Sequence, residues 1–267
     1  MVEHFTRQYD SPAYTKLINA GKHFEALERE IIEWGDYNPL LAPARALGPD
    51  LYELFRPETP VVPLLAWSGR FGDGVHNLRA ALDLLAYELC HIDGGFPAKP
   101  RKVYFPVVEN EENWAEKTEH LGSIPSTLLE RIRDVQPWHS AAPTKHALSL
   151  LTALDNMDKH RSTVGLIILP GRLDPPRLHP LPGKDESLWQ EPWMQFGMNP
   201  PLPQGALPAL WQVGPAPMVY FENRMTSLGH LQRWLFHETN RAFGYIAKGE
   251  WPTLQHPAPE PEWANLP

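Results

Sequence analysis

Three side chains that could take part in acid–base or anion chemistry recur at helical spacing in the first third of the chain. His76, Arg79 and Asp83 lie three and four residues apart, so a helix would place them on one face over two turns. An imidazole transfers protons near neutral pH, a guanidinium binds an anion, and a carboxylate orients an imidazole. The spacing therefore favours a candidate site on a helix predicted over residues 74–91.

A second group of ionisable residues ends a helix predicted over residues 144–161. The apolar stripe of that helix continues into Asp158 and Arg161, so a carboxylate and a guanidinium replace leucine on a face that should still contact protein. Lys159 and His160 flank them. If the two predicted helices pack side by side, the two ionisable groups converge.

One hypothesis is an enzyme, with a metal-independent hydrolase or RNase-like activity on a phosphodiester or nucleotide. In this hypothesis the proton-transfer pair is His76 and His160, and the carboxylate that orients it is Asp83 or Asp158. The residues that would bind the anionic substrate, a small ligand or RNA, are Arg79, Arg161, Asn77 and Lys159. A histidine with Asp83, Asp155 and Asp158 could also hold a hard cation, but no ligand spacing requires one.

The same residues also allow a structural interpretation. Arg79 with Asp83 at i,i+4 and Asp158 with Arg161 at i,i+3 would form ion pairs that lock two helices together. The protein would then be a non-catalytic binding or scaffold protein, with homodimerisation as a further expectation. The formal net charge of −8 favours this alternative, whereas the concentration of His, Arg and Asp on two stripes favours the enzyme. Both hypotheses stay open.

Composition and the common motifs exclude several classes of protein. The single cysteine, Cys90, excludes an internal disulfide and any multi-thiolate zinc or iron–sulfur site. An isoelectric point near 5.8 gives no basic field for sequence-independent binding of duplexes. The sequence lacks a dinucleotide fingerprint, a phosphate loop, His-Glu-x-x-His and Gly-x-Ser-x-Gly. Without a signal-peptide pattern or an 18-residue apolar run, we expect a soluble, cytoplasmic protein with no membrane partner.

Three strings resemble a widespread family of bacterial proteins of unassigned function. They are HNLRAALD at 76–83, QPW at 136–138 and LDNMDKHR at 154–161. Members of that family carry an HNLRxALD helix and an NxDKHR helix end, separated by a QPY/W turn. The resemblance covers residues 14–170 and implies no particular activity.

A second resemblance is to HEPN proteins, which are small helical bundles that include metal-independent RNases with an Arg-x(4–6)-His motif. Arg133 and His139 have that spacing, but Pro137 lies between them and disrupts the helix that the motif needs. This resemblance rests on the layout of the predicted helices, and it implies a helical bundle.

Hydrophobic periodicity and proline content predict the fold class. Helices are predicted over 14–34, 74–91, 127–136, 144–161 and 224–247, and strands over 103–108, 163–169 and 218–221. Residues 36–62 are predicted to be a loop with room for an edge strand at 61–62. We expect an α+β fold, mainly a bundle of about five helices with a small irregular β layer and a proline-rich wrap.

Thirty prolines in 267 residues set the expected domain organisation, because proline interrupts helices and central strands. We expect one domain over residues 1–251, in which residues 170–218 form a proline-rich cover. Residues 252–267 are predicted to be a proline-rich tail.

Overall fold

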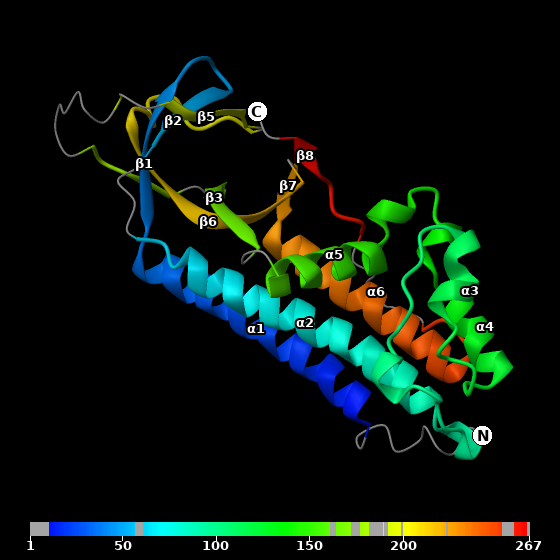
Figure 1. The fold of residues 1–267 in the computed structure, drawn as a ribbon. Helices are drawn as coiled ribbons and strands as arrows, with labels where there is room; N and C mark the ends of the chain where they lie inside the picture. The colour runs from blue at the N-terminus through cyan, green and yellow to red at the C-terminus, as the bar shows by residue number, and fades with distance from the viewer. Residues whose placement is uncertain are drawn as a thin grey trace. The chain divides into compact units, whose positions relative to one another are not determined.

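The computed structural model describes residues 11–56, 61–160, 164–171, 177–181, 189, 192–198, 200–222, 224–252 and 259–265 (Figure 1). The α-helices of this part are α1 (Pro12–Tyr37), α2 (Leu64–Leu89), α3 (Trp114–Lys117), α4 (Ser126–Asp134), α5 (Ala147–His160) and α6 (Leu228–Lys248). Short 3-10 helices cover Ile92–Gly94, Pro100–Lys102, Glu111–Asn113, Pro137–His139 and Pro143–Lys145. The strands are β1 (Leu40–Ala46), β2 (Leu51–Phe55), β3 (Gly165–Gly171), β4 (Arg177–His179), β5 (Pro192–Gly197), β6 (Ala209–Phe221), β7 (Arg224–Ser227) and β8 (Ala264–Asn265).

These elements confirm the predicted α+β class, although the β part is larger than a small irregular layer. The longest strand, β6, has 13 residues and continues through two prolines of the region predicted to be a wrap. Among the described residues, none of the helices combines the length and the apolar character needed to cross a bilayer.

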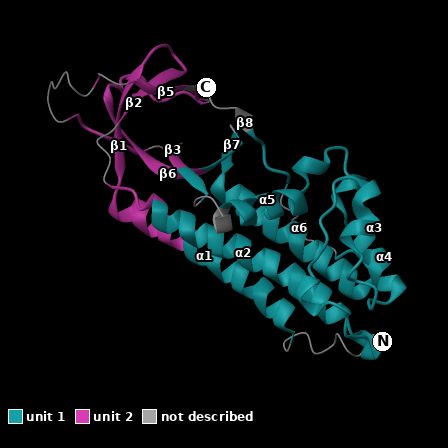
Figure 2. Cartoon of the chain, viewed as in Figure 1, with its two compact units in different colours: residues 1–27, 65–166, 219–267 teal, residues 28–64, 167–218 magenta. Residues whose placement is uncertain are grey.

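The chain forms two compact units, which Figure 2 shows in different colours. Unit 1 contains residues 1–27, 65–166 and 219–267, and unit 2 contains residues 28–64 and 167–218. The division of the chain into a single domain over 1–251 and a tail stays a prediction.

In unit 1, α2 begins ten residues earlier than predicted, because the glycine-rich stretch before residue 75 lies inside the helix. A Cβ atom at Gly74 would overlap the ring of Phe24 on α1, so the glycine permits the close approach of the two helices. The rings of Phe24 and Phe71 lie 6.0 Å apart between centroids. Sequence periodicity could not separate a glycine loop from a glycine contact of this kind.

The ends of the same two helices are joined by hydrogen bonds. Ser11 Oγ donates to Glu88 Oε2 at 2.8 Å, and the Ala13 N–H donates to Glu88 Oε1 at 2.9 Å. A carboxylate near the first turn of a helix satisfies unpaired N–H groups and interacts favourably with the helix dipole. The start of α1 therefore lies at the end of α2, and the two helices run antiparallel.

The last helix, α6, starts four residues later than predicted because residues 224–227 form β7. Ser227 caps the helix by accepting a hydrogen bond from the His230 N–H at 3.4 Å. At the other end, Gly249 adopts φ 80°, and Arg131 of α4 donates to the Ile246 carbonyl at 3.1 Å. The hydrogen bond from Arg131 therefore joins the end of α6 to α4.

In unit 2, the prediction of a loop over residues 36–62 was wrong, because β1 and β2 lie there. The strand order is β5-β2-β1-β6, and all these pairs are antiparallel. Pro43 is tolerated because β1 changes partner at Ala44. Residues 40–44 of β1 pair with β6 and residues 44–46 pair with β2, so Pro43 needs no donor toward β2.

The sheet of unit 2 buries an apolar cluster that includes Leu40, Tyr52 and Trp211. Glu53 is also buried, and its carboxylate accepts hydrogen bonds from Gln195 Nε2 at 2.7 Å and Arg45 Nε at 2.8 Å. The hydrogen bonds from Gln195 and Arg45 lower the pKa of Glu53. A buried carboxylate is stable here because it is paired and hydrogen-bonded.

Candidate functional site

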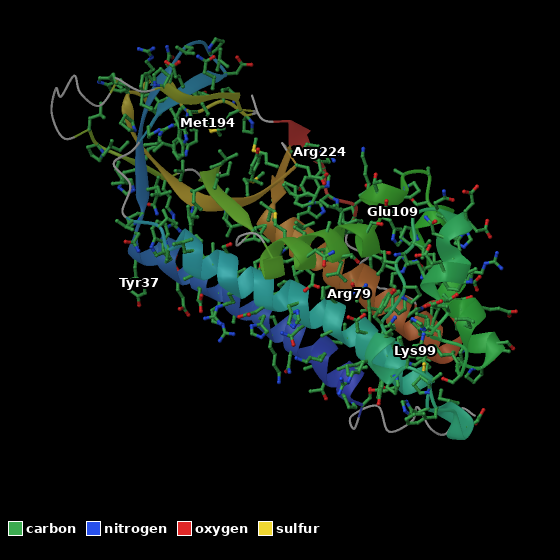
Figure 3. The ribbon with its side chains drawn as sticks, viewed as in Figure 1. Tyr37, Arg79, Lys99, Glu109, Met194 and Arg224 are labelled. Carbon is green, nitrogen blue, oxygen red and sulfur yellow. The ribbon has the colours of Figure 1, made fainter. Side chains whose placement is uncertain are left out.

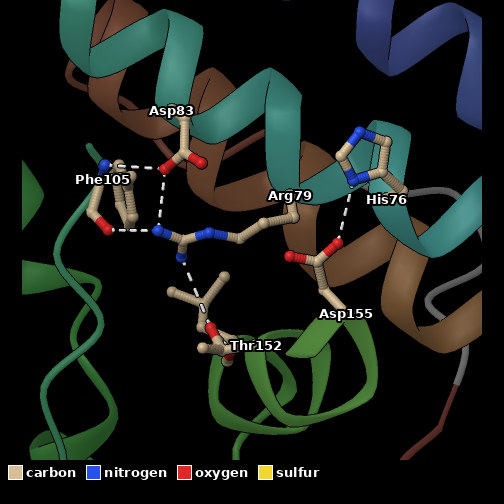
Figure 4. Close-up of polar contacts among 7 residues, drawn as sticks. His76, Arg79, Asp83, Phe105, Thr152 and Asp155 are labelled. Carbon is tan, nitrogen blue, oxygen red and sulfur yellow. Dashed lines mark hydrogen bonds and ion pairs between the residues drawn. The ribbon is translucent and has the colours of Figure 1, made fainter. Parts of the chain in front are cut away.

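Two helices of unit 1 bring together part of the predicted cluster (Figure 4). His76 Nδ1 of α2 lies 3.0 Å from Asp155 Oδ1 of α5. One turn further along α2, Arg79 Nη1 donates to Thr152 Oγ1 at 3.4 Å. Because Thr152 precedes Asp155, α2 and α5 run antiparallel at this contact. The predicted juxtaposition of these two helices is therefore present at His76 and Arg79.

Arg79 is the hub of the contacts. Its side chain carries a full charge, yet the residue is only 8% exposed. Arg79 Nη2 donates to Asp83 Oδ1 and to the Phe105 carbonyl, both at 2.7 Å, and the Phe105 N–H donates to Asp83 Oδ1 at 2.9 Å. The guanidinium, the carboxylate and the backbone of Phe105 thus form a closed ring of hydrogen bonds, which we call the Arg79 clamp.

The clamp explains why residues 103–108 do not form the strand that was predicted. The backbone of Phe105 is bound in both directions by side chains of α2, and the Val108 N–H donates to Gln136 Oε1 at 3.0 Å. Gln136 is buried and in turn donates from Nε2 to the Ile132 carbonyl at 2.8 Å. Side chains therefore satisfy backbone groups that a strand would pair with a neighbour.

The His76–Asp155 pair differs from the clamp in its exposure. The His76 side chain is 46% exposed, whereas the Asp155 side chain is 4% exposed. A carboxylate at Nδ1 orients an imidazole and fixes its tautomer, so this pair could act in proton transfer. The orienting carboxylate is Asp155, which the sequence suggested only as a cation ligand. Asp83, which was expected to orient a histidine, belongs to the clamp.

The remaining predicted site residues are not part of the described cluster. Asn77 is half-buried and donates from Nδ2 to the Asp73 carbonyl of its own helix at 2.7 Å. The side chains at the end of α5, together with the residue that follows it, lie outside the described residues: Asp158, Lys159, His160 and Arg161.

A hollow of about 450 Å³ borders the clamp. It lies between α5 and the segment from Val107 to Lys117, and Thr152 lines it. Figure 3 labels Glu109, another lining residue, on the segment before α3. Sequence reasoning missed this hollow because the 107–117 segment has no periodic pattern that would place it beside α5.

A second polar cluster in unit 1 was also missed. Two hollows of about 190 and 210 Å³ share Ser140, His146 and Glu238 in their linings. His146 immediately precedes α5, and its Nδ1 accepts a hydrogen bond from the Leu148 N–H at 3.3 Å. Burial lowers the pKa of His146, against the opposing effect of Glu238. The sequence could have indicated this cluster by placing His146 at the N-cap of the helix. The helix was instead predicted to begin three residues too early, at residue 144.

The described residues contain no group of three or more His, Cys, Asp or Glu side chains placed to hold a metal ion. Among the proposed cation ligands, Asp83 and Asp155 take part in different contacts, one with Arg79 and the other with His76. These two carboxylates therefore bind Arg79 and His76 separately and do not share a site.

The fold and this cluster define an α+β protein with a charged contact between two antiparallel helices. No protein-family model, curated protein sequence or solved structure matches the chain.

Proposed function

We propose that the protein acts by binding, without catalysis, and that its His/Arg/Asp cluster is a structural network. The observation that carries this proposal is the enclosure of Arg79, which is 8% exposed and donates to three protein acceptors. An anion would have to displace Asp83 or the Phe105 carbonyl. Leaving either group unpaired next to the protein interior costs free energy, so the guanidinium supports the fold instead of recruiting a substrate.

The test is a search for turnover that depends on His76. Wild-type protein, His76→Gln and Asp155→Asn are incubated with single-stranded RNA and with nucleoside triphosphates and cyclic nucleotides, with and without Mg²⁺. The variant His23→Gln, on α1 and outside the cluster, is the matched control for contaminating nucleases. The proposal expects all four proteins to give the same background. The proposal would be overturned if wild type and His23→Gln hydrolyse a substrate and His76→Gln does not. In that case His76→Gln must also keep the unfolding midpoint of the wild type.

The exposure of His76 favours a second candidate function, a metal-independent hydrolase acting on a phosphodiester or nucleotide. In this candidate His76 transfers the proton, and Asp155 orients the imidazole of His76. A half-exposed imidazole hydrogen-bonded to a buried carboxylate is a usual arrangement for acid–base catalysis. His160 and Arg161 would supply the second proton-transfer group and the contact to the anion. The same turnover assay decides between the two candidates.

Homodimerisation stays a prediction for either function. Sedimentation velocity over a hundredfold range of protein concentration tests it, because a reversible dimer shows a concentration-dependent sedimentation coefficient.

A further inference from the structure

We infer that the hollow beside the Arg79 clamp binds an uncharged ligand that presents a planar amide edge, as a nucleobase or a carboxamide does. This inference rests on the proposed binding function and names the ligand class. The hollow is built from residues of unit 1 and has a volume of about 450 Å³, within the size range of small-molecule sites.

The wall of the hollow is held in place before any ligand arrives. The segment that forms it is fixed at Phe105 by the Arg79 clamp and at Val108 by Gln136. On the opposite side, Thr152 accepts a hydrogen bond from Arg79 and donates to the Leu148 carbonyl at 2.9 Å. A wall that is already ordered lowers the entropic cost of binding.

Some polar side chains of the lining make no hydrogen bond within the described part of the protein. Ser149 is 6% exposed, and its hydroxyl has no hydrogen-bond partner among the described residues. Within the same described part, the side-chain amides of Asn113 and Asn156 also make no hydrogen bond, although both residues line the hollow. Asn110 uses its Oδ1 to accept from the Glu112 N–H at 3.2 Å, which leaves its NH₂ group as a donor.

These groups select the chemical class of the ligand. An asparagine amide offers a donor and an acceptor side by side, which matches the donor–acceptor edge of a nucleobase or a carboxamide. Val107 and Ala153 add apolar surface for a flat ring.

Charge argues against an anionic ligand at this position. The charged lining residues of the hollow, among those described, are Glu109 and Lys117, whose formal charges cancel. A phosphate would meet one cation and one carboxylate, whereas an uncharged ligand pays no such electrostatic cost.

The experiment is isothermal titration of the full chain with uridine, guanosine and nicotinamide, which separate the nucleoside and carboxamide sources. Uridine 5′-monophosphate and glucose are the comparison ligands. We expect saturable binding of at least one of the three probes, weakened tenfold or more by Asn156→Ala. Asn156 is exposed, so its replacement leaves the fold intact. Asn77 on α2 lies outside the hollow and bonds to its own helix, so Asn77→Ala is the matched control and should leave Kd unchanged.

The inference is overturned if none of the three probes binds, if Asn156→Ala binds as tightly as wild type, or if the monophosphate binds tenfold more tightly than uridine. Failure of the proposed function is distinguishable from this failure. His76-dependent turnover would overturn the proposed function. It would leave the inference standing as long as ligand binding is lost in Asn156→Ala and kept in His76→Gln.

Discussion

Replacing Arg79 by methionine removes the hub of the clamp while keeping an unbranched side chain of similar length. The Phe105 carbonyl then loses its partner in a buried place, which costs about 1–3 kcal/mol. Asp83 loses its ion pair but keeps the Phe105 N–H, and because its side chain is 35% exposed, this loss adds about 0.5–1 kcal/mol. We expect Arg79→Met to lower the free energy of unfolding by about 3 kcal/mol.

The assay is equilibrium unfolding in urea, monitored by far-UV circular dichroism. The free energy of unfolding in water is obtained by linear extrapolation. The matched control is Arg133→Met, which removes an ion pair with Glu111 whose side chains are 49% and 57% exposed. An exposed pair of this kind contributes less than about 1 kcal/mol. If the two variants lose stability equally, within about 0.5 kcal/mol, the reasoning about the clamp is refuted.

Three further predictions concern other parts of unit 1. Gly74→Ala should destabilise by about 1–3 kcal/mol because its methyl group overlaps Phe24. Gly69→Ala in the same helix should stabilise by about 0.5–1 kcal/mol, since its methyl group meets nothing within 4 Å; urea unfolding that ranks the two in the opposite order rejects this packing. Burial lowers the pKa of His146 in the folded protein below the usual 6.5. As the pH falls, this histidine is therefore protonated first in the unfolded chain, so the stability of the folded protein should decrease below pH 6.5. His146→Asn, which keeps a capping oxygen, should show a smaller loss between pH 7.5 and 5.5 in urea unfolding, and an equal loss would contradict the assignment. Burial raises the pKa of Cys90, so Ellman's reagent at pH 8 should react with its thiol only after urea unfolds the chain, and rapid reaction of the native protein would disprove its burial.

The longer helices could be predicted from the sequence because their apolar residues repeat at the helical period, whereas the four-residue α3 was not predicted. In α1 the residues at steps of three and four, such as Leu17 and Phe24, are the ones that the structure buries. The sheet of unit 2 could not be predicted from local pattern. Pro43 and its neighbours are unfavourable for strands, and only the change of partner at Ala44 makes the proline acceptable.

Contacts of the candidate site that lie within one helix could be predicted from the sequence. The spacing of Arg79 and Asp83 gives their contact directly, since residues at i,i+4 meet on a helix. The choice of Asp155 as the partner of His76 depends on how α5 is rotated against α2, which no local pattern encodes. The role of Phe105 was hidden for another reason, because a backbone group contributes to the clamp whatever its side chain is.

Hydrogen exchange at the amide of Phe105 tests most directly whether the cluster is a structural clamp. This N–H donates to Asp83, and the account predicts that it exchanges slowly in the native protein and that Arg79→Met speeds its exchange by more than tenfold. The exposed Asn110 on the same segment should exchange rapidly in both proteins. Exchange of the Phe105 amide as fast as that of Asn110 in the wild-type protein would contradict the account.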